Sequence, residues 1–329
     1  MKLKAKSYFL WLALALITIN LVVLLDIPVL RQISGFIFLT FVPGFFFLRL
    51  LKLKVDLAER IVLCAGLSVA IVMLLGLAIN GLLLALGYSQ PLSTISLLIS
   101  FSLATVTLAT IAYLRNKGVN FSFSGFKLTS SEKVYLIMPS LFPLLSTVGM
   151  RLMNLNSNNI LLMFLLFFIP AYVIFISFTR RRVSEKVYPV AIFLIGVSLV
   201  LMYALRSNHI IDGDTHREYF MFLTTFENRY WSQLGFGVLD ACLSITLLPA
   251  IYQTFLNINP EFLFKLLVSS IVAIMPLVVY LMSKRYIGSF YGFLASVFLI
   301  SQITFLQAPS FTRVSVAITF FALAILVLL

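Results

Sequence analysis

Charged residues are scarce in this sequence. Only 11% of the 329 residues are Asp, Glu, Lys or Arg, and there are only two histidines and two cysteines. A soluble globular protein has about 25% charged residues, so the composition excludes a water-soluble fold for the chain as a whole. Cys64 and Cys242 lie far apart in apolar segments, and their spacing indicates neither a zinc site nor a disulfide framework.

The sequence consists largely of long hydrophobic runs. The chain is 61% hydrophobic, and a helix needs roughly 20 mostly apolar residues to cross a hydrocarbon core about 30 Å thick. We predict membrane-spanning helices at residues 8–25, 33–51, 61–87, 92–114, 134–154, 159–179, 188–206, 262–283, 288–308 and 314–329. A lipid-facing backbone must satisfy its own hydrogen bonds, which favours helices throughout. The sequence therefore predicts an all-α, polytopic transmembrane helical bundle of about nine or ten spans.

The two ends of the chain carry different signals. The first apolar run follows a basic start but lacks a small-residue cleavage site, so we predict that it is an uncleaved first span. The last stretch, ITFFALAILVLL, stops inside an apolar run. We therefore expect the chain to be truncated at its C-terminus and to belong to a longer protein.

The positive charge follows the membrane pattern. The net charge is +13, but the basic residues sit in short clusters between apolar runs, as the positive-inside rule describes. This pattern argues against nucleic acid as a partner. A cytoplasmic N-terminus places most of the 24 basic residues in the cytoplasm and residues 207–261 on the opposite side. We expect a multi-pass protein of the cell membrane, in contact with membrane lipids.

Residues 207–261 form the one long connection on the extracytoplasmic side. Six of the 11 acidic residues lie in it: Asp212, Asp214, Glu218, Glu227, Asp240 and Glu261. Its stretch FGVLDACLSITLLPAIYQTFL is apolar enough to lie in the membrane interface or to re-enter the bilayer. A long loop with structure of its own is usually functional, so this segment is the first place to look for a site.

The stretch HIIDGDTHREYF, residues 209–220, concentrates the ionisable groups. Its THRE sequence fits a capping box, with Thr215 as N-cap and Glu218 three residues into a helix that begins at about His216. Asp214 would then lie just outside the positive end of the helix dipole, where a carboxylate is favoured. On this structural interpretation Glu218 is only a cap and Asp214 only a partner of the dipole.

A catalytic interpretation of the same residues is also open. Asp214 or Asp212, at the membrane boundary, could act as general base toward an acceptor hydroxyl. The same two carboxylates could instead hold a divalent cation, Mn²⁺ or Mg²⁺, through oxygen ligands. His216 could bind metal or phosphate or transfer protons, or it could be a hydrogen-bonded structural residue.

Basic residues within and outside the loop could hold an anionic phosphate in a forked contact. The candidates are Arg206, Arg217, Arg229 and Arg313. Arg313 could pair instead with the acidic loop or with a lipid phosphate. The RYW sequence at 229–231 is typical of an interfacial aromatic anchor first, and a platform for stacking a sugar is the second interpretation.

Two further helix starts are predicted in the loop. Asp240 precedes an apolar run and is expected to cap a helix. The NPE sequence at 259–261 has Asn259 as cap and Pro260 in the first turn.

Three stretches carry a resemblance to a known group of proteins. GDTHREYFMF, LSITLLPAIYQTFLNINPEFLFKLL and SFTRVSVAITFFALAILVLL resemble an uncharacterised family of large archaeal multi-pass membrane proteins that have been likened to GT-C glycosyltransferases. FVPGFFFLRLLKLKVDLAERIVLCAGLSVAIVMLLGLAINGLLLALG resembles a second archaeal membrane module, which often precedes the first. The resemblance implies an N-terminal module at 1–187, of about six spans, and the start of a GT-C-like transferase module at 188–329.

The resemblance also implies an activity. GT-C enzymes carry an acidic motif in their first outer loop and use polyprenyl-phosphate-linked sugars on the outer face of the membrane. By similarity, Asp214 would be the catalytic base or the metal-binding acid, with Asp212 and Glu218 as second choices. The chain has fewer spans than GT-C proteins and no soluble C-terminal domain. The sugar and the acceptor are not identified, and the sequence gives no oligomeric state.

Two other classes of function remain open. A transporter or flippase for a lipid-linked solute would have acids near the bilayer midplane and broken helices. A non-catalytic membrane scaffold would tolerate loss of the charges in 207–261. The clustering of acids favours the transferase.

Overall fold

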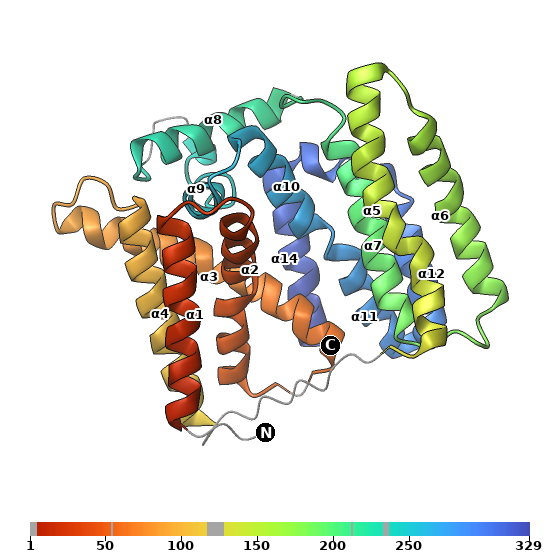
Figure 1. Ribbon diagram of the computed structural model, residues 1–329, viewed down its shortest axis with the longest axis horizontal. Helices are drawn as coiled ribbons and strands as arrows, with labels where there is room; N and C mark the ends of the chain where they lie inside the picture. Colours follow the sequence, from red (N-terminus) through yellow and green to blue (C-terminus); the bar gives the residue numbers. More distant parts are fainter. Residues whose placement is uncertain (1–4, 54, 117–127, 212, 233–236) are drawn as a thin grey trace. The chain divides into compact units, whose positions relative to one another are not determined.

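The computed structural model describes residues 5–53, 55–116, 128–211, 213–232 and 237–329. All regular elements in these ranges are helical, as predicted (Figure 1). The first seven helices are α1 (Ala5–Leu24), α2 (Leu30–Leu51), α3 (Leu57–Ala85), α4 (Thr94–Arg115), α5 (Ser130–Asn156), α6 (Ile160–Phe178) and α7 (Val187–Ala204). The later elements are α8 (Gly213–Asn228), η1 (Gly237–Leu239), α9 (Leu247–Leu256), α10 (Pro260–Val272), α11 (Met275–Ile287), α12 (Ser289–Ile300), α13 (Ile303–Leu306), η2 (Ala308–Ser310) and α14 (Thr312–Leu328).

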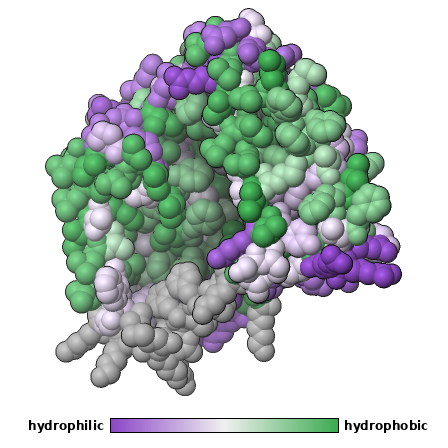
Figure 2. Space-filling model, turned by 45° about the vertical axis from the view of Figure 1, so that its right-hand side comes forward, coloured by the Kyte–Doolittle hydropathy of each residue, from purple (hydrophilic) through white to green (hydrophobic). Residues whose placement is uncertain are grey.

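Eight helices in the described part of the chain are long and apolar enough to cross a membrane. They are α1 to α7 and the helical stretch Pro260–Ile287, which joins α10 and α11. Large apolar side chains such as Trp11, Leu103 and Phe167 are exposed on them, as expected where lipid replaces water. Hydrophobic residues also cover most of the face shown in Figure 2, and hydrophilic ones gather toward its margins. The protein is an all-α, multi-pass membrane protein.

The predicted span at 288–308 differs from the structure, whereas the run at 314–329 is helical, as predicted. The run at 288–308 is not one helix, because α12 ends at Ile300 and is followed only by the short elements α13 and η2. A helix of 12 residues is about 18 Å long, well short of a bilayer core. The final helix, α14, has 17 residues. By hydropathy alone the stretch at 288–308 looks continuous. It is interrupted by the polar residues Ser301 and Gln302, and Pro309 follows directly after it.

The chain divides into two compact units. Unit 1 consists of residues 1–125 and 217–263, and unit 2 of residues 126–216 and 264–329. Each unit is therefore assembled from two separate stretches of sequence. The module boundary at residue 187 rests on a resemblance between sequences, and it stays a prediction.

Unit 1 is built on a close approach of α2 and α3. Gly44 in α2 donates its backbone N–H to the Ser68 hydroxyl at 2.7 Å. A Cβ at Gly44 would overlap with the carbonyl oxygen of Cys64 and lie 2.7 Å from the Ser68 backbone nitrogen. Only glycine allows the two helices to pack at this distance.

The apolar stretch of the long loop forms α9 inside unit 1. All ten residues of this helix are buried, and it packs against α2, α3 and α4. Before it, Trp231 is held by α3, because its backbone N–H donates to the Asn80 side chain at 2.7 Å. At its other end, α9 is held by Arg31 and Gln32 at the start of α2. Both anchors lie at the same end of the α2–α3 pair, and a re-entrant position of α9 in the bilayer stays a prediction.

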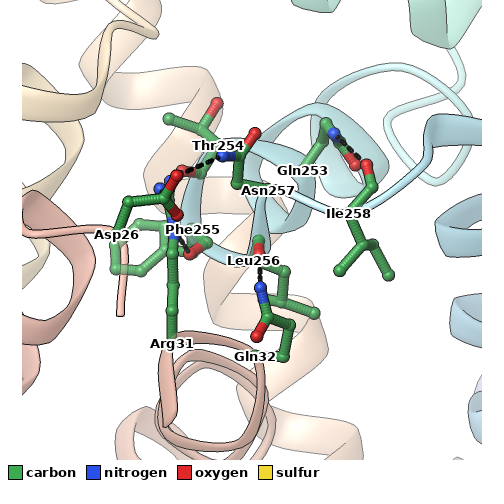
Figure 3. Close-up of polar contacts among 9 residues, drawn as sticks. All are labelled: Asp26, Arg31, Gln32, Gln253, Thr254, Phe255, Leu256, Asn257 and Ile258. Carbon is green, nitrogen blue, oxygen red and sulfur yellow. Dashed lines mark hydrogen bonds and ion pairs between the residues drawn. The ribbon is translucent and has the colours of Figure 1, made fainter. Parts of the chain in front are cut away.

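Arg31 holds the carboxyl end of α9 (Figure 3). Its Nε donates to the Phe255 carbonyl at 2.8 Å and its Nη2 to the Thr254 carbonyl at 2.7 Å. Its Nη1 is 2.6 Å from a carboxylate oxygen of Asp26, whose other oxygen accepts from the Asn257 amide at 3.0 Å. The bond from Arg31, followed by that from Asn257, lowers the pKa of Asp26, which keeps the carboxylate charged at neutral pH.

Unit 2 is built on the packing of α5 against α6 and α7. The buried Ser146 hydroxyl in α5 donates to the Ser198 carbonyl of α7 at 2.7 Å. In α12 the Ser296 hydroxyl donates at 2.9 Å to the carbonyl of Pro276, near the start of α11. Buried serines thus join the membrane helices where a larger side chain would separate them.

Replacing Arg31 should loosen α9. Arg31→Gln removes a buried cation and leaves the carbonyls of Thr254 and Phe255 without their donor. We expect a loss of about 2–4 kcal/mol, measured as a lower unfolding temperature in detergent. Arg151→Gln, at an exposed arginine of α5, is the control and should change little. Equal unfolding temperatures for the two variants would contradict the assigned role of Arg31.

Adding one methyl group should separate α2 from α3. Gly44→Ala places a Cβ against the backbone of Cys64 and Ser68, and we expect a destabilisation of about 1–3 kcal/mol or more. Gly81→Ala in α3 is a matched control, because a Cβ there has nothing within 4 Å. The control should be neutral or slightly stabilising. Thermal unfolding compares the two, and a tolerated Gly44→Ala would refute the close packing.

Candidate functional site

The acidic stretch forms the start of α8. The helix begins at Gly213, so Thr215 lies inside the first turn and is not the N-cap. The predicted capping box is therefore wrong. The Thr215 hydroxyl donates instead to the Ser310 carbonyl at 2.9 Å, a partner that the local sequence does not reveal.

The predicted catalytic carboxylates have different surroundings. Asp214 is exposed and lies in the first turn of α8, where the helix dipole favours its negative charge. Glu218 is buried, with 3% of its surface exposed, and with Thr215 inside the helix it is not the partner of a capping box. Asp212 lies outside the described residues. Asp214 is thus the candidate base that is open to a substrate.

The predicted basic residues are spread over both units. His216 and Arg217 are exposed in α8. Arg313 is half-buried at the start of α14. Because Thr215 bonds to Ser310, the turn of α8 that carries Asp214 and His216 lies near the turn that carries Arg313 in unit 2.

Arg229 has a structural position in unit 1. It adopts a positive φ of 57° just after the last residue of α8. Its carbonyl accepts the backbone N–H of Leu92 at 2.8 Å, and its guanidinium donates to the Gln90 side chain at 3.2 Å. The residue therefore fixes the end of α8 to the connection between α3 and α4.

A small polar pocket lies in unit 2, where α7 ends and α8 begins. It has a volume of about 30 Å³, close to the space of one water molecule. Its polar lining consists of Tyr203, Arg206, His209, Thr215, Lys265 and Ser310. Arg206 and Lys265 bring positive charge to it, and the described part of its lining includes no Asp or Glu.

The pocket is built by contacts among its own lining residues. The Arg206 guanidinium carbon lies 3.6 Å from the centre of the Tyr203 ring, a cation–π contact that orients the side chain. The Ser310 hydroxyl donates to the Tyr203 hydroxyl at 3.2 Å. Lys265 Nζ donates to the carbonyls of Ser207 at 2.8 Å and His209 at 2.6 Å. Lys265 thereby fixes the turn that follows α7.

Most of this pocket is not visible in the sequence. Arg206 was a candidate phosphate ligand, and Thr215 was a candidate cap. Tyr203, Lys265 and Ser310 come from three separate segments and carry no shared motif. Besides Arg206, a usable signal is Lys265, a single cation within the otherwise apolar run FLFKLLVSS.

The aromatic and capping predictions for the rest of the loop have mixed outcomes. Trp231 is not simply an interfacial anchor, because its indole N–H donates to the Asp240 carbonyl at 2.9 Å. Asp240 does not cap α9, whose N-cap is Thr246; Asp240 is buried instead. The Asn259 cap is confirmed, since its side chain accepts the Phe262 backbone N–H at 3.1 Å.

The metal prediction stays open. Within the described ranges, no group of three or more His, Cys, Asp or Glu side chains could hold a metal ion. The predicted pair, Asp212 and Asp214, has only Asp214 in these ranges. A Mn²⁺ or Mg²⁺ site at this pair therefore stays a prediction.

Comparison with known proteins assigns no family. The chain matches no family model, no curated protein and no solved structure.

Removing the Lys265 ammonium should loosen the turn that forms one wall of the pocket. Lys265→Met keeps the length of the side chain but leaves the carbonyls of Ser207 and His209 without their donor. We expect faster amide hydrogen exchange across residues 205–211 and a loss of about 1.5–3 kcal/mol. Lys133→Met, at an exposed lysine, should leave exchange in this turn unchanged. Unaltered exchange in Lys265→Met would mean that the turn does not depend on Lys265.

Proposed function

We propose that the protein is a GT-C-like membrane glycosyltransferase that moves a sugar from a polyprenyl-phosphate donor to an acceptor. The observation that carries the proposal is the cationic pocket at the end of α7. Its wall includes Thr215, next to the exposed Asp214. The pocket that would take the phosphate and the candidate base therefore lie within one turn of helix, at the end of an apolar span.

The chemistry needs one binding step and one proton transfer. The pocket has room for about one small group, so it would take an oxygen of the donor phosphate and not a whole sugar. Arg206 supplies charge-assisted hydrogen bonds to that oxygen. The apolar polyprenyl chain would stay in the bilayer beside α7.

Asp214 would act as the general base. It takes the proton from an acceptor hydroxyl while the acceptor oxygen attacks the anomeric carbon of the sugar. The bond between this carbon and the phosphate oxygen breaks, and polyprenyl phosphate leaves with the bonding electrons. The cations at the pocket stabilise the charge of the leaving phosphate.

A divalent cation has a place in this proposal but no step depends on it. Asp212 and Asp214 would hold it, and it would add positive charge beside the phosphate. The charge pattern of the loops supports a reaction on the extracytoplasmic face of the cell membrane.

A flippase or transporter of lipid-linked solutes is the second candidate. Interrupted helices favour it, because α10 and α11 are separated at residues 273–274 and α12 ends well before α14. The positions of the acids favour the transferase. In the eight long apolar helices described, the acidic residues are Glu59, Glu132 and Glu261, each in a first turn. A non-catalytic scaffold stays the third candidate.

Loss of the candidate base should abolish transfer. We expect Asp214→Asn to lower kcat about 10²–10⁴-fold and to leave the unfolding temperature unchanged, because Asp214 is exposed. Release of polyprenyl phosphate from a panel of lipid-linked sugars, with and without Mn²⁺ or Mg²⁺, measures the rate. Glu227→Gln, at an exposed acid near the other end of α8, is the matched control.

Arg206→Gln separates the phosphate site from the base. Loss of a charge-assisted bond to the donor should lower kcat/KM about 10–100-fold. Full activity of Asp214→Asn, or equal losses in Asp214→Asn and Glu227→Gln, would refute the assignment of the base. Transport of intact lipid-linked sugar without release of polyprenyl phosphate would favour the flippase.

A further inference from the structure

Unit 2 carries a second cationic feature at its other end, near the start of α7. It consists of seven basic residues, which we call the basic patch: Lys133, Arg180, Arg181, Arg182, Lys186, Lys284 and Arg285. They come from the start of α5, the connection between α6 and α7, and the end of α11. The pocket lies at the opposite end of α7, which has 18 residues and is about 27 Å long. The pocket and the basic patch are therefore separated by about the thickness of a bilayer core.

The protein's own contacts join these segments. The Lys284 ammonium is 3.6 Å from a carboxylate oxygen of Glu185. The Arg180 guanidinium carbon lies 5.4 Å from the centre of the Phe290 ring. The backbone of Glu185 accepts a long hydrogen bond from the Tyr280 hydroxyl at 3.5 Å. The connection between α6 and α7 is thus held against α11 and α12.

Both acidic residues at this end have partners within the protein. Glu185 pairs with Lys284. Glu132 forms the capping box of α5 with Thr129 and bonds to the Ser184 side chain. The two carboxylates therefore balance only a small part of the cationic charge. Six of the cations are exposed: Lys133, Arg180, Arg181, Arg182, Lys186 and Arg285.

Exposed aromatic residues adjoin the basic patch. Phe178, just before Arg180, is 86% exposed, Tyr286 is 70% exposed and Tyr291 is 54% exposed. Aromatic rings beside cations at the ends of apolar helices are typical of the membrane–water interface. This arrangement fits a lipid surface better than a soluble partner, because a soluble partner would not need the apolar rim.

We propose that the basic patch binds the phosphate headgroups of acidic lipids in the leaflet that it faces. Clusters of four to eight Lys or Arg next to a membrane helix attract anionic lipids. The guanidinium groups of Arg181 and Arg182 can hold phosphate oxygens in forked contacts. The rings of Tyr286 and Tyr291 lie at the depth of the headgroups. This site does not depend on the proposed transferase activity.

Lipid retention by the full chain tests the proposal. The protein is purified in neutral detergent and offered equal amounts of phosphatidylglycerol and phosphatidylcholine, and bound lipid is counted by native mass spectrometry. We expect wild type to retain phosphatidylglycerol about tenfold more than phosphatidylcholine, and this preference to fall in 0.5 M salt, as electrostatic binding must. The triple variant Arg181→Gln/Arg182→Gln/Lys186→Gln should lose the preference.

A second triple variant is the matched control. Lys52→Gln/Arg60→Gln/Arg115→Gln removes the same amount of charge from unit 1 and should keep the preference. Arg181→Lys/Arg182→Lys keeps the charge and should retain part of the preference for phosphatidylglycerol. The unfolding temperature of each variant in lipid-free detergent separates misfolding from loss of binding.

Three results would overturn the proposal. The first is an unchanged preference in the Arg181/Arg182/Lys186 variant, which would leave the basic patch with a role in membrane orientation only. The second is an equal loss of the phosphatidylglycerol preference in both triple variants, which would mean that net charge alone accounts for lipid retention. The third is retention of soluble poly-glutamate in place of phosphatidylglycerol, which would favour an acidic protein partner.

Discussion

A helix end inside a membrane body needs hydrogen-bond donors for its last carbonyls, and Arg31 supplies them for α9. The final four carbonyls of any α-helix lack partners within the helix, and lipid offers no substitute. Arg31 donates to the carbonyls of Thr254 and Phe255, and Gln32 donates to that of Leu256 at 2.8 Å. Just beyond the helix, the Gln253 amide donates to the Ile258 carbonyl at 2.6 Å. These donors allow an apolar stretch of a long loop to be buried in unit 1 instead of lying on its surface.

The same requirement explains the polar contacts of unit 2. Its pocket lies where α7 ends, and Lys265 satisfies two carbonyls in the turn that follows. A cation that serves this structural purpose also brings positive charge to the pocket, beside Arg206. In the proposed function, structural and binding roles are therefore combined at this end of α7. At the other end, the cations exceed the acids that could neutralise them, and the excess charge is left for headgroups.

Local hydropathy predicted the fold class and the first seven spans because each is a continuous apolar run that ends near charged residues. It did not predict the interruptions after α12, because Ser301 and Gln302 are too few to change the hydropathy of a window. The capping box failed for a different reason. Its residues fit the motif, but the helix starts at Gly213, and the Thr215 hydroxyl has a partner in Ser310, far along the chain.

The candidate site was predictable only where one segment contains it. The acidic stretch pointed to Asp214, and Arg206 was recognisable as an arginine at the end of a span. The contact of Tyr203 with Ser310 depends on how α7 and η2 pack. The hydrogen bond from Arg31 to the end of α9 likewise joins residues that are more than two hundred positions apart in the sequence.

The most direct test of the central claim, that the pocket at the end of α7 is a phosphate site beside a base, is an electron cryomicroscopy structure in a lipid nanodisc containing polyprenyl phosphate. The account predicts density for the phosphate within about 3 Å of the Arg206 guanidinium, with Asp214 facing the side from which an acceptor would approach. Phosphate bound elsewhere in the protein, with water alone beside Arg206, would contradict it.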